Sequence, residues 1–364
     1  MGIKDFYKQL KTRHPECFIP VHYAQLRYQK IAIDMMNVLY VYKSRNDRDW
    51  MKLLLEFLIS LRKYYVHPVC VFDGQSHPLK QNTVQKRRTE REKGRNRVEQ
   101  LRESLEVYKT TSTINDHLRG FLDSHDEFVS KLSRLPLVGS IQEHIDRQFK
   151  NYNIHFRTTE IEGLKDLIRA MGICVLTADH DGEALCSYLS SIGEVDIVLS
   201  NDSDVFFFGC KTVLVKFTNE GGYLVHLDTV LKKLELSMEQ FIDLCLLCGT
   251  DFNIPIRGIG FCRAYALVQK YNSVQNIDMP LHDQLDHSLL EEIRQMAFPV
   301  TQPEKAHYSK PVDPTILGLK LFQHQIFMSL DMFTWPEAHL EYDKYDNSDF
   351  EADSTLDNQE EITV

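Results

Sequence analysis

The 364-residue sequence lacks any uninterrupted apolar run long enough to cross a bilayer, which excludes an ordinary membrane-spanning helix. The N-terminal segment also lacks the apolar stretch of a signal peptide and carries Lys4, Asp5 and Lys8 instead. The sequence begins with Met1 and Gly2, but Phe6 stands where N-myristoylation needs Ser or Thr. We therefore expect a protein without a membrane anchor.

Patterns typical of zinc and nucleophile chemistry are missing as well. Cys245 and Cys248 form a CxxC in LCLLCG, but no second pair follows at zinc spacing, and the 15 histidines show no HExxH. Most of the eight cysteines lie inside apolar segments, as Cys70 does in PVCVF. We interpret them as reduced core residues of an intracellular protein.

An excess of positive charge is also absent, since the net charge is −10. Residues 341–364 contain nine acids and one base, a net charge of −8, which leaves the other 340 residues at −2. Residues 86–97 (KRRTEREKGRNR) carry seven bases and two acids, a net charge of +5. The acidic balance therefore does not exclude a surface that binds nucleic acid.

What the sequence does contain is an alternation of helix-like and strand-like segments, which predicts an α/β fold. We expect helices at 50–65, 160–171, 183–192, 237–248 and 261–271, and a long helix-prone charged segment from Lys80 to about Asn153. We expect strands at 30–34, 68–73, 173–178, 196–200 and 205–209, and a hairpin formed by 213–217 and 223–227.

Carboxylates stand at the ends of several of these expected elements. Asp34 and Asp73 each follow an apolar strand, and Asp202 and Asp204 follow the strand at 196–200. Asp181 and Glu183 lie at a strand-to-helix turn, and Asp251 closes a helix. Because open parallel sheets place their binding sites at the carboxyl ends of strands, all seven can meet at one edge.

Seven such acids cannot share a small volume in ionised form without cations. Hard oxygen ligands without His or Cys favour Mg²⁺ or Mn²⁺ over zinc. Two ions about 4 Å apart can hold the attacking and leaving oxygens of a phosphodiester displacement. For any single acid, a helix cap or a turn is the competing interpretation. The repetition at four separate places favours a metal site.

The motifs resemble those of the flap endonuclease/XPG (Rad2-like) nucleases. The segments MGIKDF, KIAIDMMNVLY, VFDG, DGEALC, SNDSDVFFFG and LCGTDFNIPIRGIG follow the blocks of that family in order, over roughly residues 1–90 and 158–271. The resemblance implies a PIN-like/XPG nuclease fold with a mainly parallel central sheet, a helical arch and a helix–two-turn–helix module.

The resemblance also implies the ligands of two metal ions. Asp34, Asp73, Asp181 and Glu183 would bind the first ion. Asp202, Asp204 and Asp251 would bind the second, with Glu183 close to both. Asp181 replaces the Glu usual in the family, which shortens the side chain by one methylene group.

Several further residues acquire expected roles from the family. Lys80 and Arg87 match basic residues that reach over the scissile phosphate and offset its charge; solvated helix charge is the alternative. Tyr40 matches an aromatic residue that stacks on a terminal base, although it could equally belong to the core. The other expected DNA contacts are Arg88 and Arg91, in the charged segment that begins at Lys80, and Gly258, Gly260, Arg263 and Lys270 in the helix–two-turn–helix, whose turn often binds K⁺ in the family.

The resemblance predicts a division of the chain. Residues 1–90 and 158–271 would form the nuclease domain, with the helix–two-turn–helix at about 251–271, and 91–157 would form the arch. Residues 272–340 would be a helical or irregular extension, and 341–364 an acidic disordered tail. The chain ends QEEITV without the aromatic pair of a sliding-clamp peptide, so clamp binding is not expected.

The expected function is a Mg²⁺-dependent structure-specific 5′ nuclease that cuts flapped or branched DNA, with possible 5′→3′ exonuclease action. Two alternatives stay open at this point. One is a non-catalytic protein that binds DNA junctions, and the other is a nuclease acting on RNA or RNA–DNA junctions. We expect a monomer in the nucleus, or in the host nucleus if the chain comes from a large DNA virus.

Overall fold

A computed structural model describes residues 2–124, 137–253, 255–256, 258–277, 285–297 and 305–334. The acidic tail expected at 341–364 lies outside the described residues. No helix within the described ranges is long and apolar enough to cross a membrane.

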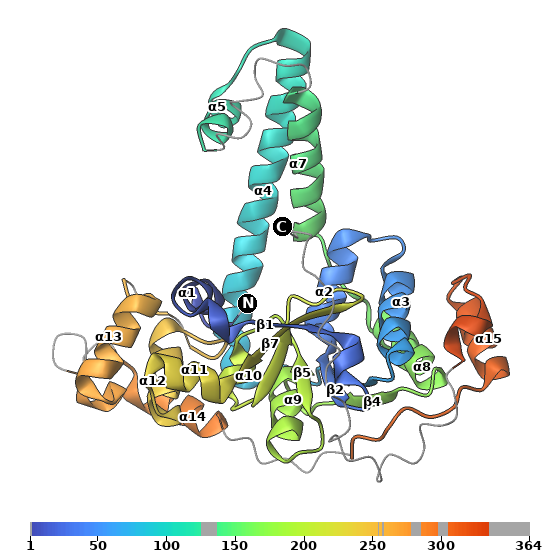
Figure 1. Ribbon diagram of the computed structural model, residues 1–364. Helices are drawn as coiled ribbons and strands as arrows, with labels where there is room; N and C mark the ends of the chain where they lie inside the picture. Colours follow the sequence, from blue (N-terminus) through green and yellow to red (C-terminus); the bar gives the residue numbers. More distant parts are fainter. Residues whose placement is uncertain are drawn as a thin grey trace.

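A seven-stranded sheet forms the centre of the molecule, with the strand order β1-β7-β6-β5-β2-β3-β4 (Figure 1). Strands β2 to β6 are parallel to one another, whereas β7 pairs antiparallel with both β6 and β1. The strands are β1 Ile19–His22, β2 Lys30–Asp34, β3 His67–Phe72, β4 Cys174–Thr177, β5 Ile197–Leu199, β6 Thr212–Val215 and β7 Gly221–His226. The expected α/β fold with a mainly parallel sheet is confirmed.

Helices cover both faces of this sheet because its central strands are apolar on both sides, as parallel strands usually are. All six residues of β3 are buried, as are four of the five in β2. One hydrophobic cluster packs α2 (Met35–Arg45), α3 (Trp50–Lys63), α8 (Thr158–Ala170) and α15 (Pro314–Gln323) against one face. A second cluster covers the other face with α1 Phe6–Arg13, α9 Gly182–Ser191, α10 Asp204–Phe207, α11 Leu227–Leu234, α12 Met238–Cys248, α13 Phe261–Tyr271 and α14 His287–Met296.

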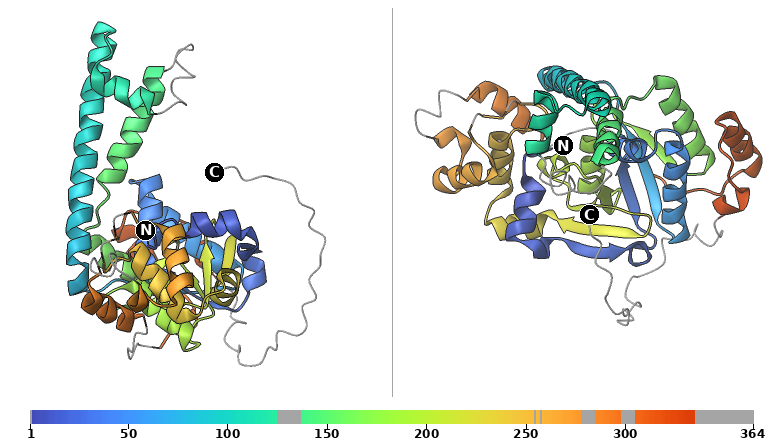
Figure 2. Two further views of the ribbon diagram at one scale, coloured as in Figure 1. Left: turned by 90° about the vertical axis from the view of Figure 1, so that its left-hand side faces the viewer. Right: turned by 90° about the horizontal axis from the view of Figure 1, so that it is seen from above.

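A stalk of helices rises from the body of the molecule (Figures 1 and 2). Helix α4 (Gln81–Thr111) runs outward, α5 (Asp116–Asp123) lies near its tip, and α7 (Leu137–Tyr152) returns beside α4. Apolar side chains join the three helices in a separate cluster that includes Leu105 and Ile145, both fully buried. The two legs of the expected arch therefore pack against each other along the stalk.

The structure corrects one expected strand. Residues 205–209 (VFFFG) do not form a strand, because Asp204–Phe207 is the short helix α10. Val205, Phe206 and Phe207 are all buried, so every position of this segment is apolar. An uninterrupted apolar run has neither the period of a helix nor that of a strand, and its sequence therefore could not distinguish the two. The expected hairpin is confirmed, since β6 and β7 pair antiparallel.

Candidate active site

The carboxyl ends of neighbouring parallel strands bring acids from distant parts of the chain together. Asp34 is the last residue of β2, and Asp73 directly follows β3, its partner in the sheet. The charge of Asp73 acts on Asp34, and Asp73 in turn feels the charges of Asp181 and Asp251. The edge expected from the sequence is therefore a single anionic region.

Asp34 is held rigidly by the elements on either side of it. Its Oδ1 accepts a hydrogen bond from the backbone N–H of Asn37, which caps helix α2, and its Oδ2 accepts one from Ser200 Oγ at 2.8 Å. Ser200 follows β5, the other neighbour of β2, and its Oγ also accepts a hydrogen bond from the Asp202 N–H. One hydroxyl therefore sets the relative positions of Asp34 and Asp202.

Asp181 and Glu183 lie at the start of helix α9. The backbone N–H of Gly182, the residue between them, donates a hydrogen bond to Asp73 Oδ1 at 2.9 Å. The ammonium of Lys80, at the end of the short turn η3 (Pro78–Lys80), is 2.8 Å from Asp181 Oδ1 and 3.1 Å from Glu183 Oε1. Both contacts are shielded from solvent, so Lys80 is a buried counter-charge of these acids.

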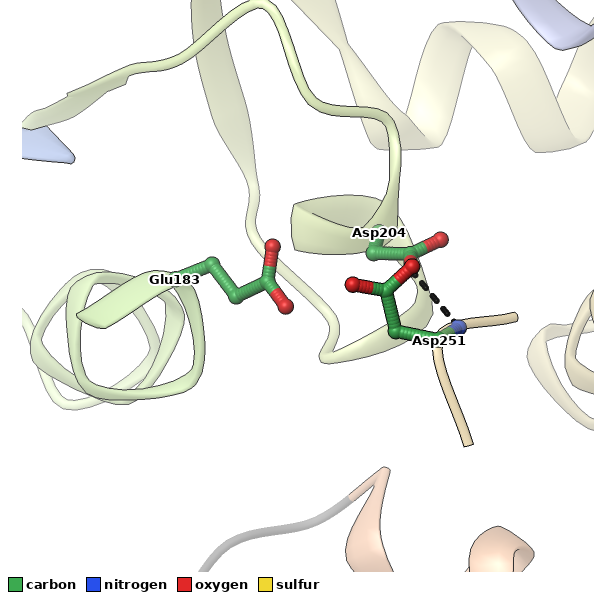
Figure 3. A group of neighbouring side chains, drawn as sticks. All are labelled: Glu183, Asp204 and Asp251. Atoms are coloured by element: carbon green, nitrogen blue, oxygen red, sulfur yellow. Dashed lines mark hydrogen bonds between the residues drawn. The ribbon is translucent and has the colours of Figure 1, made fainter. Parts of the chain in front are cut away.

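Glu183, Asp204 and Asp251 form the tightest group, and each offers a carboxylate oxygen within 4.8 Å of the others (Figure 3). All three are buried. The N–H of Asp251 donates to Asp204 Oδ2 at 3.3 Å, which ties the segment after α12 to the start of α10. Asp202 contacts the same unit, because its Oδ1 accepts from the Asp204 N–H.

Burial and mutual repulsion raise the pKa values of five of the acids, namely Asp34, Asp73, Glu183, Asp202 and Asp204. Desolvation is the main cause at Asp34, whose pKa rises to about 7 with a further contribution from Asp73. Desolvation likewise raises the pKa values of Glu183 and Asp204 well above their usual range. Burial alone would lower the pKa of Lys80, but the carboxylates around it outweigh this effect and raise it. The site holds more negative charge than its own cations neutralise.

The chemistry of this group fits a divalent cation. Asp204 Oδ1 is buried and has no hydrogen-bond partner among the described residues, so one oxygen is left for another ligand. The donors are all carboxylate oxygens, which Mg²⁺ and Mn²⁺ prefer. A cation there would also relieve the repulsion that raises the pKa values.

The two basic residues expected at the phosphate contact the acids directly. Arg87, on the lower part of α4, forms a short ion pair with Asp251. Lys80 approaches the other oxygen of Asp251 at 3.6 Å and also lies 4.8 Å from the ring of Phe252. Both side chains therefore reach the acid cluster.

The expected DNA contacts in the arch gather around a cavity of about 680 Å³ at the base of the stalk. Arg87, Arg88 and Arg91 line one side of it. Tyr40 lies nearby, with the Arg91 guanidinium 6.0 Å from its ring centre and Phe156 packed edge-on at 5.3 Å. The other side of the cavity is lined by residues 152–155, which connect α7 to α8.

The remaining expected contacts lie around α13, away from this cavity. Gly258 has a left-handed φ of 82°, and its carbonyl accepts a hydrogen bond from Arg263 at 3.4 Å. Gly260 caps the start of α13, whose last turn carries Lys270. Lys270 contacts the hydroxyl and ring of Tyr271.

Three supporting residues were not anticipated from the sequence. Ser200 bonds two acids, Asn37 accepts a hydrogen bond from the Asn201 N–H at 3.1 Å, and Asn201 accepts one from the Lys216 N–H at 2.8 Å. Ser200 and Asn201 belong to the SNDSD motif, so polarity next to the acids was the available signal. The hydrogen bond from the Lys216 N–H to Asn201 Oδ1 depends on the pairing of β5 with β6.

Two family models match the chain. The XPG N-terminal domain matches residues 1–94, and the XPG I-region matches residues 172–251. Together they contain all seven acids of the cluster, and residue 251 is the last residue of the second match.

Similar curated proteins are nucleases. A probable RAD2-like endonuclease (369L) of Invertebrate iridescent virus 6 is 28% identical over 304 residues, which are 76% of this chain and 73% of the relative. A second one (076L), of Invertebrate iridescent virus 3, is 28% identical and covers 88% of this chain and 93% of its own length. Flap endonuclease 1 of Brugia malayi is 27% identical, with coverages of 83% and 72%.

Solved structures share the fold. The catalytic core of Rad2 in complex with a DNA substrate aligns with a TM-score of 0.58 at 17% identity, over 91% of this chain and 97% of that one. Flap endonuclease-1 from Methanococcus jannaschii aligns with a TM-score of 0.55 at 23% identity, over 87% and 92%. The arrangement of sheet and helices is thus that of these nucleases.

Proposed function

This chain belongs to the XPG and flap endonuclease family, and from that premise we propose that it is a Mg²⁺-dependent 5′ nuclease that cuts flapped or branched DNA. The observation that carries the proposal is the convergence of Glu183, Asp204 and Asp251 on one buried point beside Lys80 and Arg87. A buried set of oxygen ligands next to two cations is suited to phosphodiester hydrolysis.

The seven acids are the candidate metal ligands. Asp34, Asp73, Asp181 and Glu183 would hold one ion, and Asp202, Asp204 and Asp251 a second, with Mn²⁺ as a substitute for Mg²⁺. When bound, such ions lower the pKa of a ligated water and neutralise charge on the reacting phosphate.

The side chains around the metal ligands would position the ligands and neutralise charge on the phosphate. Ser200 and Asn37 fix the Asp34 carboxylate, so that its oxygens need little rearrangement to accept a ligand. Lys80 and Arg87 now pair with carboxylates, and a bound phosphate would compete for the same ammonium and guanidinium groups. Both cations would then offset the negative charge that develops on the phosphate oxygens.

The basic cavity at the base of the stalk is the proposed path for a single strand. Arg87, Arg88 and Arg91 supply positive charge, and Tyr40 supplies an aromatic surface for a base. The turn at Gly258 and Gly260 with the start of α13 would bind duplex phosphates, aided by Arg263 and Lys270. Backbone carbonyls of that turn are candidate K⁺ ligands. A nuclear location and a monomeric state are part of the proposal.

A cleavage assay tests this function directly. A 5′-labelled double-flap DNA should be cut near the flap junction in Mg²⁺ and left intact in EDTA. Replacement of the flap by RNA would distinguish an RNA nuclease. Tight binding of the flap with no product in Mg²⁺ or Mn²⁺ would overturn the nuclease proposal in favour of a non-catalytic junction binder.

A further inference from the structure

The connector between α7 and α8 carries a phenylalanine that packs against the body of the molecule. The ring centre of Phe156 lies 5.3 Å from that of Tyr40 at an interplanar angle of 88°, and 5.4 Å from that of Trp50 at 79°. Both pairs have the edge-to-face geometry that aromatic rings favour. Residues 152–155, which precede this phenylalanine, line the basic cavity. Phe156 therefore joins the wall of the cavity to helices α2 and α3.

A buried cation holds Phe156 in this position. Lys43 of α2 is 6% exposed, and its Nζ lies 4.6 Å from the ring centre of Phe156 and 5.2 Å from that of Trp50. The same Nζ is 3.7 Å from Glu160 Oε1, and the other oxygen of this carboxylate accepts a hydrogen bond from the Arg157 N–H at 2.8 Å. A cation beside aromatic rings is attracted most strongly where water is excluded. Lys43 thus fixes both Phe156 and the start of α8 to α2.

Tyr40 is the residue at which both legs of the stalk meet the body. Phe156 approaches it from the α7 side, and the Arg91 guanidinium of α4 lies 6.0 Å from its ring centre. Tyr40 is partly buried, so some of its surface stays accessible beside the cavity that Arg91 lines. Helix α2, which carries Tyr40, is capped by Asp34, whose Oδ1 accepts a hydrogen bond from the Asn37 N–H. One helix and its cap therefore carry both the ring and a candidate metal ligand.

A partly exposed tyrosine ring can rotate about two side-chain bonds, whereas stacking on a base needs one fixed ring plane. The flat, rigid ring of Phe156 packs at a right angle to the Tyr40 ring and restricts that rotation. A leucine at this position would fill much of the same volume but would offer no flat ring to pack against. Because small displacements of substrate-positioning groups lower rates strongly, loss of this contact should be measurable in the reaction.

We infer that Phe156 is a positioning residue, which holds the Tyr40 ring in the plane in which that ring stacks on an unpaired base of the substrate. The inference rests on the proposed function, in which Tyr40 supplies the aromatic surface. Phe156 lies outside both regions that the family models match, residues 1–94 and 172–251, so neither match assigns it a role. It acts on the base through Tyr40 and contributes no charge to the phosphate.

The test is the fluorescence of a double-flap DNA that carries 2-aminopurine next to the flap junction, bound at saturation in Ca²⁺. Stacking on an aromatic ring quenches this base, so the wild-type complex should fluoresce less than the Tyr40→Ala complex. Phe156→Leu should shift the fluorescence toward the Tyr40→Ala value. It should also slow single-turnover cleavage in Mg²⁺ by about three- to tenfold, part of the loss expected for a missing stacking ring. Once Tyr40 is replaced by Ala, Phe156→Leu should have no further effect.

Phe333→Leu is the matched control, because Phe333 is fully buried in the hydrophobic cluster against which Phe156 packs. It should lower the melting temperature at least as much as Phe156→Leu, yet leave fluorescence and cleavage as in the wild type when both are measured well below that temperature.

Wild-type fluorescence in Phe156→Leu, or additive losses in the double variant with Tyr40→Ala, would overturn the positioning role even if the wild-type protein cuts flaps normally. Equal fluorescence of the wild-type and Tyr40→Ala complexes would overturn it as well. The expected fluorescence shifts without cleavage by the wild type would instead contradict only the proposed catalytic function.

Discussion

The ammonium of Lys80 lies 2.8 Å from Oδ1 of Asp181, so a lysine of the turn after β3 is bound to an acid at the start of α9. The same ammonium is within 3.6 Å of Asp251. A side-chain cation therefore occupies part of the volume that the carboxylates enclose. Lys80 can act on the phosphate only if divalent ions and substrate draw it away from these acids.

This geometry predicts that Lys80 opposes metal binding while it supports cleavage. Lys80→Met should reduce single-turnover cleavage of flap DNA by about 10²- to 10³-fold, the usual effect of removing one charge-stabilising group. The same variant should bind Mn²⁺ at least as tightly as the wild type, because a competing cation is gone. Paramagnetic titration measures the Mn²⁺ affinity, and exposed Lys63→Met serves as the control. Weaker Mn²⁺ binding in Lys80→Met would mean that the ammonium orders the carboxylates.

Asp204 provides a second prediction, because its Oδ1 is buried without a partner among the described residues. Asp204→Asn removes one ligand charge and should weaken Mn²⁺ binding by at least about tenfold, with loss of measurable cleavage. In EDTA the variant should melt at a higher temperature than the wild type at neutral pH, since one source of buried repulsion is gone. Asp228→Asn, at an exposed position of α11, should change neither property. Unchanged Mn²⁺ affinity in Asp204→Asn would remove this residue from the metal site.

The strand-end acids could be predicted from sequence because each follows a short apolar run that forms a buried parallel strand. Asp34 and Asp73 are examples, and parallel neighbours necessarily end at the same edge of the sheet. The contact of Asp251 with Asp204 could not be derived in this way, since it depends on how α12 packs beside α10. The family motifs supplied that connection instead.

Other features of the fold could not be predicted from the sequence, for physical reasons. Residues 205–208 are buried and apolar, so their composition fits a buried strand as well as the short helix α10 that the structure shows. The hydrogen bond from the Lys216 N–H to Asn201 requires the register of β5 against β6, which short polar side chains do not signal. The packing of α4 against α7 depends on a register between two helices that are separated by residues outside the described ranges.

The raised pKa of Asp34 predicts how pH affects the metal-free protein. Burial, with a contribution from Asp73, sets this pKa to about 7, whereas an unfolded Asp titrates near 4. Between these values the folded state binds more protons than the unfolded state, so stability must fall as pH rises through this window. In EDTA we expect a higher melting temperature at about pH 5.5 than at about pH 8, and Mg²⁺ should stabilise the protein more at the higher pH.

The control for this pH effect is Asp34→Asn, which cannot ionise at this position. Its melting temperature in EDTA should depend less on pH than that of the wild type, by the share that Asp34 contributes. Glu183 and Asp204 also have raised pKa values, so some pH dependence should persist in the variant. A melting temperature of the wild type that rises with pH over this range would contradict the inferred protonation of the cluster.

The stalk gives the last prediction, because its apolar cluster keeps α4 and α7 together above the basic cavity. Ile145 is fully buried in this cluster, and Gly94 of α4 lies so close to the Tyr152 ring that an added Cβ would be 2.4 Å from it. Ile145→Asp places an unpaired carboxylate among apolar side chains and should separate the helices. We expect faster hydrogen exchange in α4 and α7 and at least about tenfold slower flap cleavage, because misplacement of substrate-positioning groups reduces rates strongly.

Mn²⁺ affinity should stay unchanged in this variant, since the seven acids lie outside the stalk. Val107→Asp, at an exposed position of α4, should behave as the wild type. Normal cleavage by an opened stalk would show that the substrate reaches the acids without the cavity between α4 and residues 152–155.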